Sequence, residues 1–123
     1  MIERPTVLYV DDEPINLKLF EINFKNQFQV LTANDAYSGL EQLEKISSIK
    51  VVVSDMKMPR MNGIEFIRKA KAKYSNVKYF MLSGFETTPE IEEAIDEGLF
   101  LKYFRKPFNK NEICSALEEA IGE

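Results

Sequence analysis

Val7-Leu8-Tyr9-Val10-Asp11-Asp12-Glu13-Pro14 is an apolar run followed by three acids and a proline, and it is the most informative segment for the fold. An unbroken apolar run is typical of a parallel strand that is covered on both faces. Proline is favoured in the first turn of a helix, so Pro14 predicts that a helix begins there. A buried strand, a polar turn and a helix in succession form the repeating unit of an α/β fold.

The same unit recurs along the chain. Further apolar runs lie at residues 28–33, 51–53, 79–82 and 99–104, and the segments between them carry apolar residues at helical spacing. One helical stripe is Ile91, Ala94 and Ile95. The alternation predicts an α/β fold with a doubly wound, five-stranded parallel sheet and right-handed connections. We expect residues 1–123 to form one domain, and the same pattern is compatible with a domain excised from a longer chain.

Composition excludes several kinds of chemistry. The 123 residues contain no histidine, so no histidine metal site, proton shuttle or histidine-assisted nucleophile can be built from them. The single cysteine excludes an internal disulfide framework. A net charge of −4 disfavours direct nucleic-acid binding, and no stretch approaches the roughly 20 apolar residues of a membrane span. We therefore expect a soluble cytoplasmic domain.

Polar residues follow the apolar runs where ligands bind in open α/β sheets, beyond the carboxyl ends of the strands. Asp11 and Asp12 follow the first run, and Asp55 follows the third. In the flavodoxin-like strand order 2-1-3-4-5 the first and third strands are neighbours, so these three side chains should converge. Ser83-Gly84 and Lys106 follow the fourth and fifth runs.

Each residue alone also has an ordinary interpretation: Asp12 as a helix cap, Asp55 as a turn residue, Lys106 as a solvated lysine. The combination favours a site. Two carboxylates about 5 Å apart repel by roughly 3 kcal/mol at an effective dielectric of 20, so three require a cation. Oxygen ligands without histidine or cysteine indicate Mg²⁺. Lys106 would add a fixed positive charge, which suits a transferred phosphoryl group.

These residues stand in an order that resembles a known family. The sequence is similar, over essentially the whole chain, to the receiver domain of two-component response regulators, the class of the bacterial chemotaxis response regulator. The motifs that carry the resemblance are Val10-Asp11-Asp12-Glu13-Pro14, Ser54-Asp55-Met56-Lys57-Met58-Pro59, Met61-Asn62-Gly63, Ser83-Gly84 and Lys106-Pro107-Phe108.

The resemblance implies how phosphorylation would proceed. Asp55 would be the phosphoacceptor, forming an aspartyl phosphate. Asp12 and Asp55 would bind Mg²⁺ directly together with the backbone carbonyl of Lys57, and Asp11 would act mostly through a metal-bound water. The domain would catalyse only its own phosphorylation and dephosphorylation, and so would not be an enzyme with turnover.

Further roles are implied for residues at the fourth and fifth strand ends. Lys106 would neutralise phosphoryl oxygens, while the Ser83 hydroxyl and the Gly84 amide would bind the attached phosphoryl group. Lys106-Pro107 would carry a cis peptide. Tyr103 would turn inward as Ser83 moves, changing an output surface; its ordinary alternative is an edge-strand aromatic with no switching role.

Two positions are expected to tune hydrolysis of the phosphoryl group. Lys57 and Phe85 each lie two residues after a phosphoryl-binding residue, beside the path of an attacking water in this family. Neither side chain has a carboxylate or amide that would orient this water. The resemblance therefore predicts slow self-dephosphorylation.

The first helix carries two apolar faces. Leu17, Phe20 and Phe24 lie on one side, and Ile15, Leu19 and Ile22 on the other. Because a helix that covers a sheet needs only one apolar stripe, the second is expected to be partly exposed and to contact a partner. By resemblance, the helical bundle of a sensor histidine kinase would dock on Ile15, Asn16, Leu19 and Ile22. Burial against a neighbouring helix is the alternative.

Three functions are weighed. The preferred one is a phosphorylation-activated signalling receiver that takes its phosphoryl group from a histidine kinase or phosphotransfer protein and acts on a downstream effector domain or protein. It would be a monomer or a phosphorylation-dependent dimer. The alternatives are a Mg²⁺-dependent aspartyl-phosphate phosphatase and an unphosphorylated, interaction-only receiver. Phosphatases of that type place Asp-x-Asp after the first strand, whereas Asp11 and Asp12 are adjacent.

Overall fold

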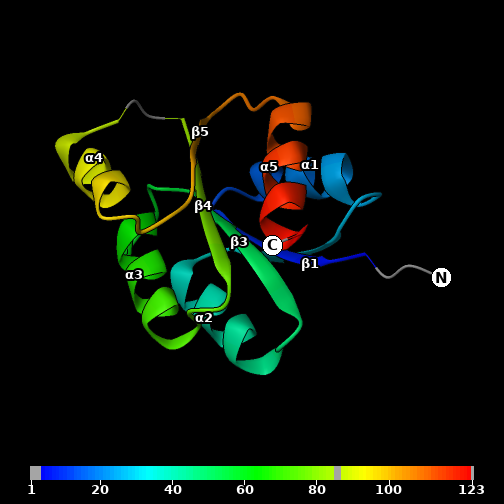
Figure 1. Cartoon of the computed structure of the whole chain (residues 1–123), viewed down its shortest axis with the longest axis horizontal. Coiled ribbons are helices and arrows are strands. Elements are labelled where there is room, and N and C mark those ends of the chain that lie inside the picture. The colour runs from blue at the N-terminus through cyan, green and yellow to red at the C-terminus, as the bar shows by residue number, and fades with distance from the viewer. Residues whose placement is uncertain (1–3, 85–86, 123) are drawn as a thin grey trace.

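The computed structural model describes residues 4–84 and 87–122, and strands and helices alternate throughout this part of the chain (Figure 1). The strands are β1 (Thr6–Val10), β2 (Gln29–Ala33), β3 (Ile49–Ser54), β4 (Lys78–Ser83) and β5 (Tyr103–Arg105). The helices are α1 (Pro14–Phe24), α2 (Ala36–Lys45), α3 (Gly63–Lys73), α4 (Pro89–Asp96) and α5 (Lys110–Gly122). Among the described residues, no helix is long and apolar enough to cross a bilayer.

The strands form one sheet in the order β2-β1-β3-β4-β5, and each neighbouring pair in this order is parallel. The predicted fold class and strand order are therefore confirmed. β1 lies between β2 and β3, with Val10 opposite Ala33 on one side and Ser54 on the other. This register brings the ends of β1 and β3 to the same edge of the sheet.

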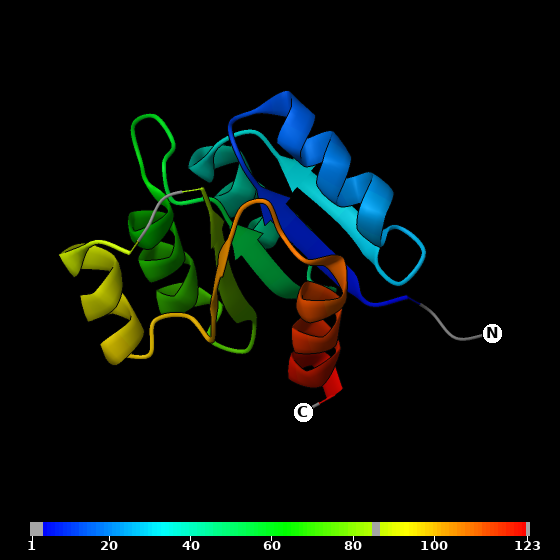
Figure 2. The same ribbon diagram turned by 90° about the horizontal axis from the view of Figure 1, so that it is seen from above.

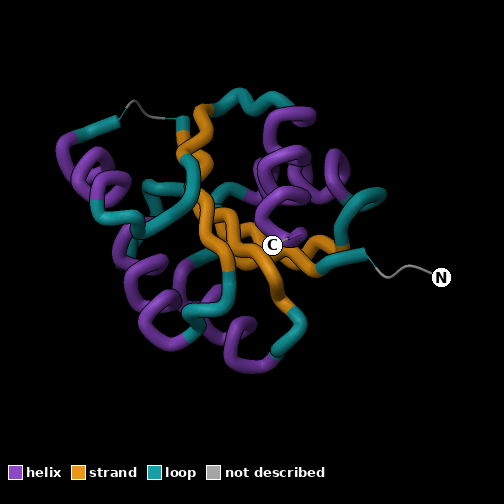
Figure 3. Tube along the Cα trace, viewed as in Figure 1, coloured by secondary structure: helices purple, strands orange, loops and turns teal. Residues whose placement is uncertain are grey.

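Helices cover both faces of the sheet, as Figures 2 and 3 show. Alternate strand residues point to opposite sides, so each face has its own core. Leu8, Val10 and Val52 pack with residues of α2, α3 and α4. Val7, Tyr9 and the other alternating strand residues pack with α1 and α5. Burial on both faces explains why the strands read as continuous apolar runs.

The last strand is shorter than the sequence predicts. The apolar run begins at Leu99, but only Tyr103–Arg105 forms β5. Gly98 adopts a positive φ of 72° after α4, and the Leu99 amide donates to the carbonyl of Ala94. Leu99 and Phe100 therefore lie in the turn that ends α4, and their buried side chains pack in the core with residues of α3 and α4. The predicted helical stripe is also corrected, since Ile95 is exposed.

The two faces of α1 differ as predicted. Phe20 and Phe24 are fully buried against the sheet, whereas Ile15, Leu19 and Ile22 are exposed. Leu19 keeps 46% of its surface accessible. The second apolar stripe therefore has no covering helix within the described part of the chain, and the alternative of burial against a neighbouring helix is excluded there.

Candidate active site

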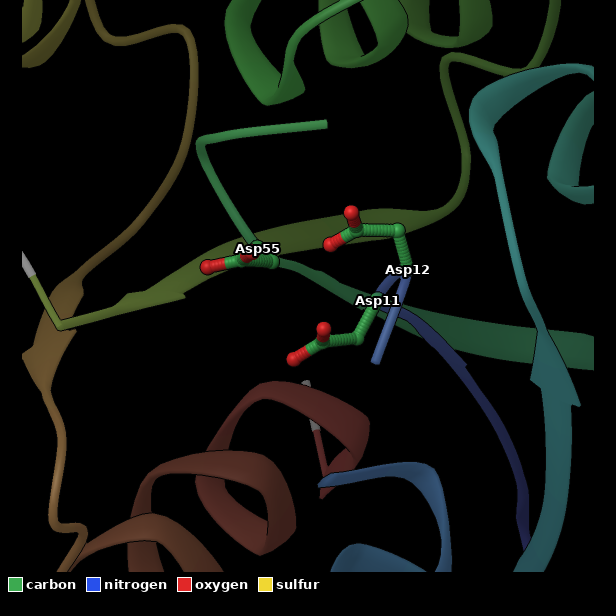
Figure 4. A group of neighbouring side chains, drawn as sticks. All are labelled: Asp11, Asp12 and Asp55. Atoms are coloured by element: carbon green, nitrogen blue, oxygen red, sulfur yellow. The ribbon is translucent and has the colours of Figure 1, made fainter. Parts of the chain in front are cut away.

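The carboxylates of Asp11, Asp12 and Asp55 meet at the carboxyl edge of the sheet (Figure 4). One oxygen from each lies within 4.8 Å of the others. The backbone fixes this convergence, because the Asp55 amide donates to the carbonyl of Val10 at 2.8 Å and the Asp11 amide to that of Ala33 at 3.1 Å. Asp11 and Asp55 are buried and Asp12 is exposed. The predicted convergence is thus present.

Asp11 accepts hydrogen bonds from three partners in the site. Its Oδ2 accepts hydrogen bonds from the Tyr9 hydroxyl at 2.6 Å and from Lys106 Nζ at 2.7 Å. Its Oδ1 accepts from the backbone amide of Glu13 at 3.0 Å. The N-cap residue of α1 is Glu13, which makes no side-chain cap bond. The interpretation of Asp12 as a helix cap is therefore wrong.

Lys106 joins the carboxylates to the fourth strand. Its Nζ also lies 3.4 Å from Asp55 Oδ1, so one ammonium group bridges Asp11 and Asp55. Its backbone amide donates to the carbonyl of Ser83 at 2.9 Å, which ties the end of β4 to the lysine. The Lys106–Pro107 peptide is cis, as the family resemblance implies.

The loop after Asp55 is held by the start of α3. The Gly63 amide donates to the carbonyl of Met56 at 2.7 Å, and a Cβ at position 63 would collide with the carbonyl oxygen of Asp55. Asn62 and Glu65 form a reciprocal capping box that fixes this first turn. Glycine is therefore required where the helix approaches the backbone of Asp55.

Burial and crowding change the ionisation of the site. Burial, and next the Asp11 carboxylate, raise the pKa of Asp55, Lys106 opposes both, and the net pKa is about 6. Burial alone would lower the pKa of Lys106, but its hydrogen bond to Asp11 and the nearby Asp55 raise it above its ordinary value. Burial, and next the Asp11 charge, raise the pKa of Tyr9, so this phenol is a hydrogen-bond donor at neutral pH.

An open cleft of about 550 Å³ gives access to these groups. The predicted residues Asp12, Asp55, Lys57, Gly84 and Lys106 line it, together with Glu13, Asn16, Met58 and Pro59. Asn16, expected on the docking face, thus also borders the cleft. Ser83 is buried at the end of β4.

Tyr103, the predicted switch residue, is not among the residues that line this cleft. Tyr103 is half-buried and packs against the core beside α2, α3 and α4. Phe85 lies outside the described residues.

Sequence reasoning missed Tyr9 as a residue of the site. The apolar run predicts only a strand at Tyr9, although alternate residues of a strand point to the same face. The spacing of Tyr9 and Asp11 was the available signal, because it places the phenol and the carboxylate on one side of β1.

The donor set fits a hard divalent cation. All three side chains offer carboxylate oxygens, and one ammonium group contacts two of them. A cation with several oxygen ligands would relieve the remaining repulsion, and Mg²⁺ prefers such ligands. With a lysine beside the carboxylates, the arrangement suits the binding of a phosphoryl group.

Fold and site define a class of protein, and comparison with known proteins identifies it. Residues 7–118 match the family model of the response regulator receiver domain. The chain therefore belongs to this family and is a receiver domain for phosphorylation-activated signalling.

The relatives span regulators of different size. The chain is 40% identical over 90 residues to the uncharacterized transcriptional regulatory protein YesN of Bacillus subtilis, covering 72% of this chain and 24% of YesN. It is 30% identical to sporulation initiation phosphotransferase F of Bacillus subtilis, covering 94% of this chain and 92% of that protein. The chain thus spans about a quarter of YesN and nearly all of the phosphotransferase.

Solved structures show the same fold. A signal receiver domain of an HD domain-containing protein from Pseudomonas fluorescens Pf-5 has a TM-score of 0.90 and 26% identity, covering 98% of this chain and 96% of that one. The chemotaxis protein CheY4 of Vibrio cholerae has a TM-score of 0.84 and 27% identity, covering 95% of this chain and 98% of that one.

The raised pKa of Asp55 predicts a pH-dependent stability. Without metal, the folded protein holds a proton on Asp55 up to about pH 6, whereas the unfolded chain loses it near pH 4. Stability is therefore lost as pH rises through this window, and Asp55→Asn removes the loss. We therefore compare the free energies of unfolding of Asp55→Asn and the wild type at each pH. We expect the difference, variant minus wild type, to grow by about 2 kcal/mol between about pH 4 and pH 7.5. Urea unfolding in EDTA measures it; a constant difference would contradict the shift.

Proposed function

We propose that this receiver accepts a phosphoryl group on Asp55 and that Lys106 and the end of β4 stabilise the transferred group. The observation that carries the proposal is the bridging ammonium of Lys106, which contacts both Asp11 and Asp55 beside an open cleft. Membership of the receiver family supports the same assignment.

The chemistry is nucleophilic transfer from a phosphohistidine. A carboxylate oxygen of Asp55 attacks phosphorus, the new P–O bond forms as the P–N bond breaks, and the departing histidine nitrogen keeps the electron pair. The ammonium of Lys106 turns from the carboxylates to a phosphoryl oxygen, and the Ser83 hydroxyl and Gly84 amide donate to the others. Asp11, Asp12 and Asp55, with the carbonyl of Lys57, would hold Mg²⁺, which supplies positive charge for the phosphoryl oxygens.

Phosphorylation by a small donor tests this assignment. We expect the intact mass of the wild type to rise by one phosphoryl group after incubation with acetyl phosphate and Mg²⁺, and the mass of Asp55→Asn to stay unchanged. Asp35→Asn, at a carboxylate that caps α2 instead, is the matched control and should be phosphorylated like the wild type. Phosphorylation of Asp55→Asn to the same extent would place the acceptor elsewhere, and an unmodified wild type would favour an interaction-only receiver.

The lifetime of the phosphorylated form is part of the same proposal. Lys57 is exposed at the cleft and carries no carboxylate or amide, which supports slow hydrolysis. The contribution of Phe85 stays a prediction. The decay of the phosphorylated mass in the experiment above measures this lifetime. In this proposal the domain catalyses only its own phosphorylation and dephosphorylation, and it does not convert a separate substrate.

Tyr103 is the proposed switch between the site and an output surface. It lies on β5, directly opposite Met81 of β4 and two positions from the pair Ser83–Arg105. A shift of Ser83 toward a phosphoryl group would therefore change the packing beside its ring. We expect the ring signals of Tyr103 in NMR spectra to shift when beryllofluoride and Mg²⁺ are added. Unchanged ring signals would remove Tyr103 from the switch.

The exposed face of α1 is the proposed docking surface for the phosphoryl donor. Ile15, Leu19 and Ile22 supply apolar contact area, and Asn16 borders the cleft. Beside them lies a groove of about 570 Å³ between α1 and the segment that precedes α5, lined by Tyr9, Asn16, Leu19, Asn23, Lys106, Pro107, Phe108 and Lys110. A helix of a histidine kinase or phosphotransfer protein would bring its phosphohistidine to the cleft from this side.

A charge on this face should block docking without harming the fold. We expect Leu19→Glu to slow phosphotransfer from a purified phosphohistidine donor domain at least tenfold, because it places a charge in an apolar contact, while labelling by acetyl phosphate continues at the wild-type rate. Leu101→Glu is the matched control, since Leu101 is also exposed, at 58%, but follows α4. Equal transfer rates in both variants would contradict docking on α1.

Partners and location complete the proposal. The phosphohistidine donor is another domain or protein because this chain has no histidine. The downstream partner is an effector domain or protein. YesN, which this chain matches over only a quarter of its length, is named as a transcriptional regulatory protein. The proposed location is the cytoplasm, and the proposed state is a monomer or a dimer that forms on phosphorylation.

A further inference from the structure

The side chain of Tyr9 is buried against Asp11, one of the three carboxylates of the site. It lies on β1 with 1% of its surface exposed, and its hydroxyl donates to Asp11 Oδ2 at 2.6 Å. Its ring is stacked on Phe20 of α1, with centroids 4.2 Å apart and planes 11° from parallel. A phenol fixed by its ring and aimed at a buried carboxylate has few alternative orientations, so it can determine where that carboxylate points.

The partners of Asp11 show why this bond matters. A carboxylate has about four sites that accept hydrogen bonds or metal ions. In Asp11 three are used: Oδ2 by Tyr9 and Lys106, and Oδ1 by the Glu13 amide. When Lys106 turns to a phosphoryl group, Asp11 loses one partner inside the protein. Tyr9 and the Glu13 amide then remain, one on each oxygen, and keep the plane of the carboxylate fixed.

We propose that Tyr9 is a positioning residue of this receiver, which orients Asp11 for Mg²⁺ and satisfies its buried oxygen when Lys106 moves to the phosphoryl group. This inference rests on the proposed function of the site and extends it to a residue that touches neither metal nor phosphoryl group. Hydrogen-bond partners of metal-binding carboxylates commonly set metal affinity, and their loss weakens binding by 10- to 100-fold.

The contacts around the ring connect this position to the docking face. Phe20 also contacts the ring of Phe108 in an edge-on arrangement, with centroids 6.5 Å apart. Phe108 follows Lys106 and lines the groove beside α1. The hydroxyl of Tyr9 is thus held in place by the same helix that carries the exposed apolar stripe.

The chain offers a matched control in a second buried tyrosine. Tyr79 lies on β4 and its hydroxyl donates to the backbone carbonyl of Tyr74 at 2.9 Å. It packs in the core on the other face of the sheet from Tyr9. Tyr79→Phe therefore removes a buried hydroxyl and its hydrogen bond away from the carboxylates, as Tyr9→Phe does beside them.

The test is the Mg²⁺ affinity of the metal-free wild type, Tyr9→Phe and Tyr79→Phe, measured by isothermal titration calorimetry. Phenylalanine keeps the stacked ring, and urea unfolding without Mg²⁺ verifies that each variant is folded. We expect Tyr9→Phe to raise the Mg²⁺ dissociation constant about tenfold and Tyr79→Phe to leave it within about twofold of the wild type. The Mg²⁺-induced shift of the urea midpoint should shrink for Tyr9→Phe alone.

Each other outcome is decisive. A dissociation constant within twofold of the wild type in Tyr9→Phe would overturn the positioning role, as would equal weakening in both variants, because the cause would then be general loosening of the core. A wild type that binds no Mg²⁺ would instead overturn the proposed metal site, and the positioning role with it.

Discussion

The bridge from Lys106 to Asp11 and Asp55 is the interaction on which the rest of the site depends. The fold places three carboxylate groups within 4.8 Å, two of them buried. Without compensating positive charge, such crowding costs several kcal/mol. The ammonium group of Lys106, with contacts of 2.7 Å to Asp11 and 3.4 Å to Asp55, relieves part of this repulsion. The negative charge that remains attracts a cation. This electrostatic repulsion is located at Asp55, the residue proposed to accept the phosphoryl group.

The surrounding structure keeps the carboxylates from moving apart. Hydrogen bonds between strand ends fix the backbones of Asp11 and Asp55, and the close approach of Gly63 closes the loop that follows Asp55. On the other side, the stacked rings of Tyr9 and Phe20 form a rigid support below Asp11. A side chain held by such contacts cannot relieve repulsion by rotating to solvent, so the sheet, α1 and α3 all contribute to the chemistry of the cleft.

Much of this organisation was predictable because it is encoded locally. Continuous apolar runs indicated buried parallel strands, and Pro14, predicted to begin a helix, is the first residue of α1. The failures have physical causes. Leu99 and Phe100 look like strand residues, but Gly98 turns the chain and buries them beside the helices. Ile95 fits a helical stripe, yet the short α4 buries only Ile91 and Ala94.

The sequence alone determined the fold class, the strand order expected from it and the acids, serine and lysine that follow the strands, because hydrophobic periodicity and turn residues act over short distances. Tertiary packing determines which oxygen of Asp11 binds Lys106 and places the phenol of Tyr9 against that carboxylate. The structure also shows that Glu13, and not Asp12, occupies the N-cap position of α1. Lys106 and Asp11 lie 95 residues apart in the chain and are brought together by packing, so no local pattern records the geometry of their contact.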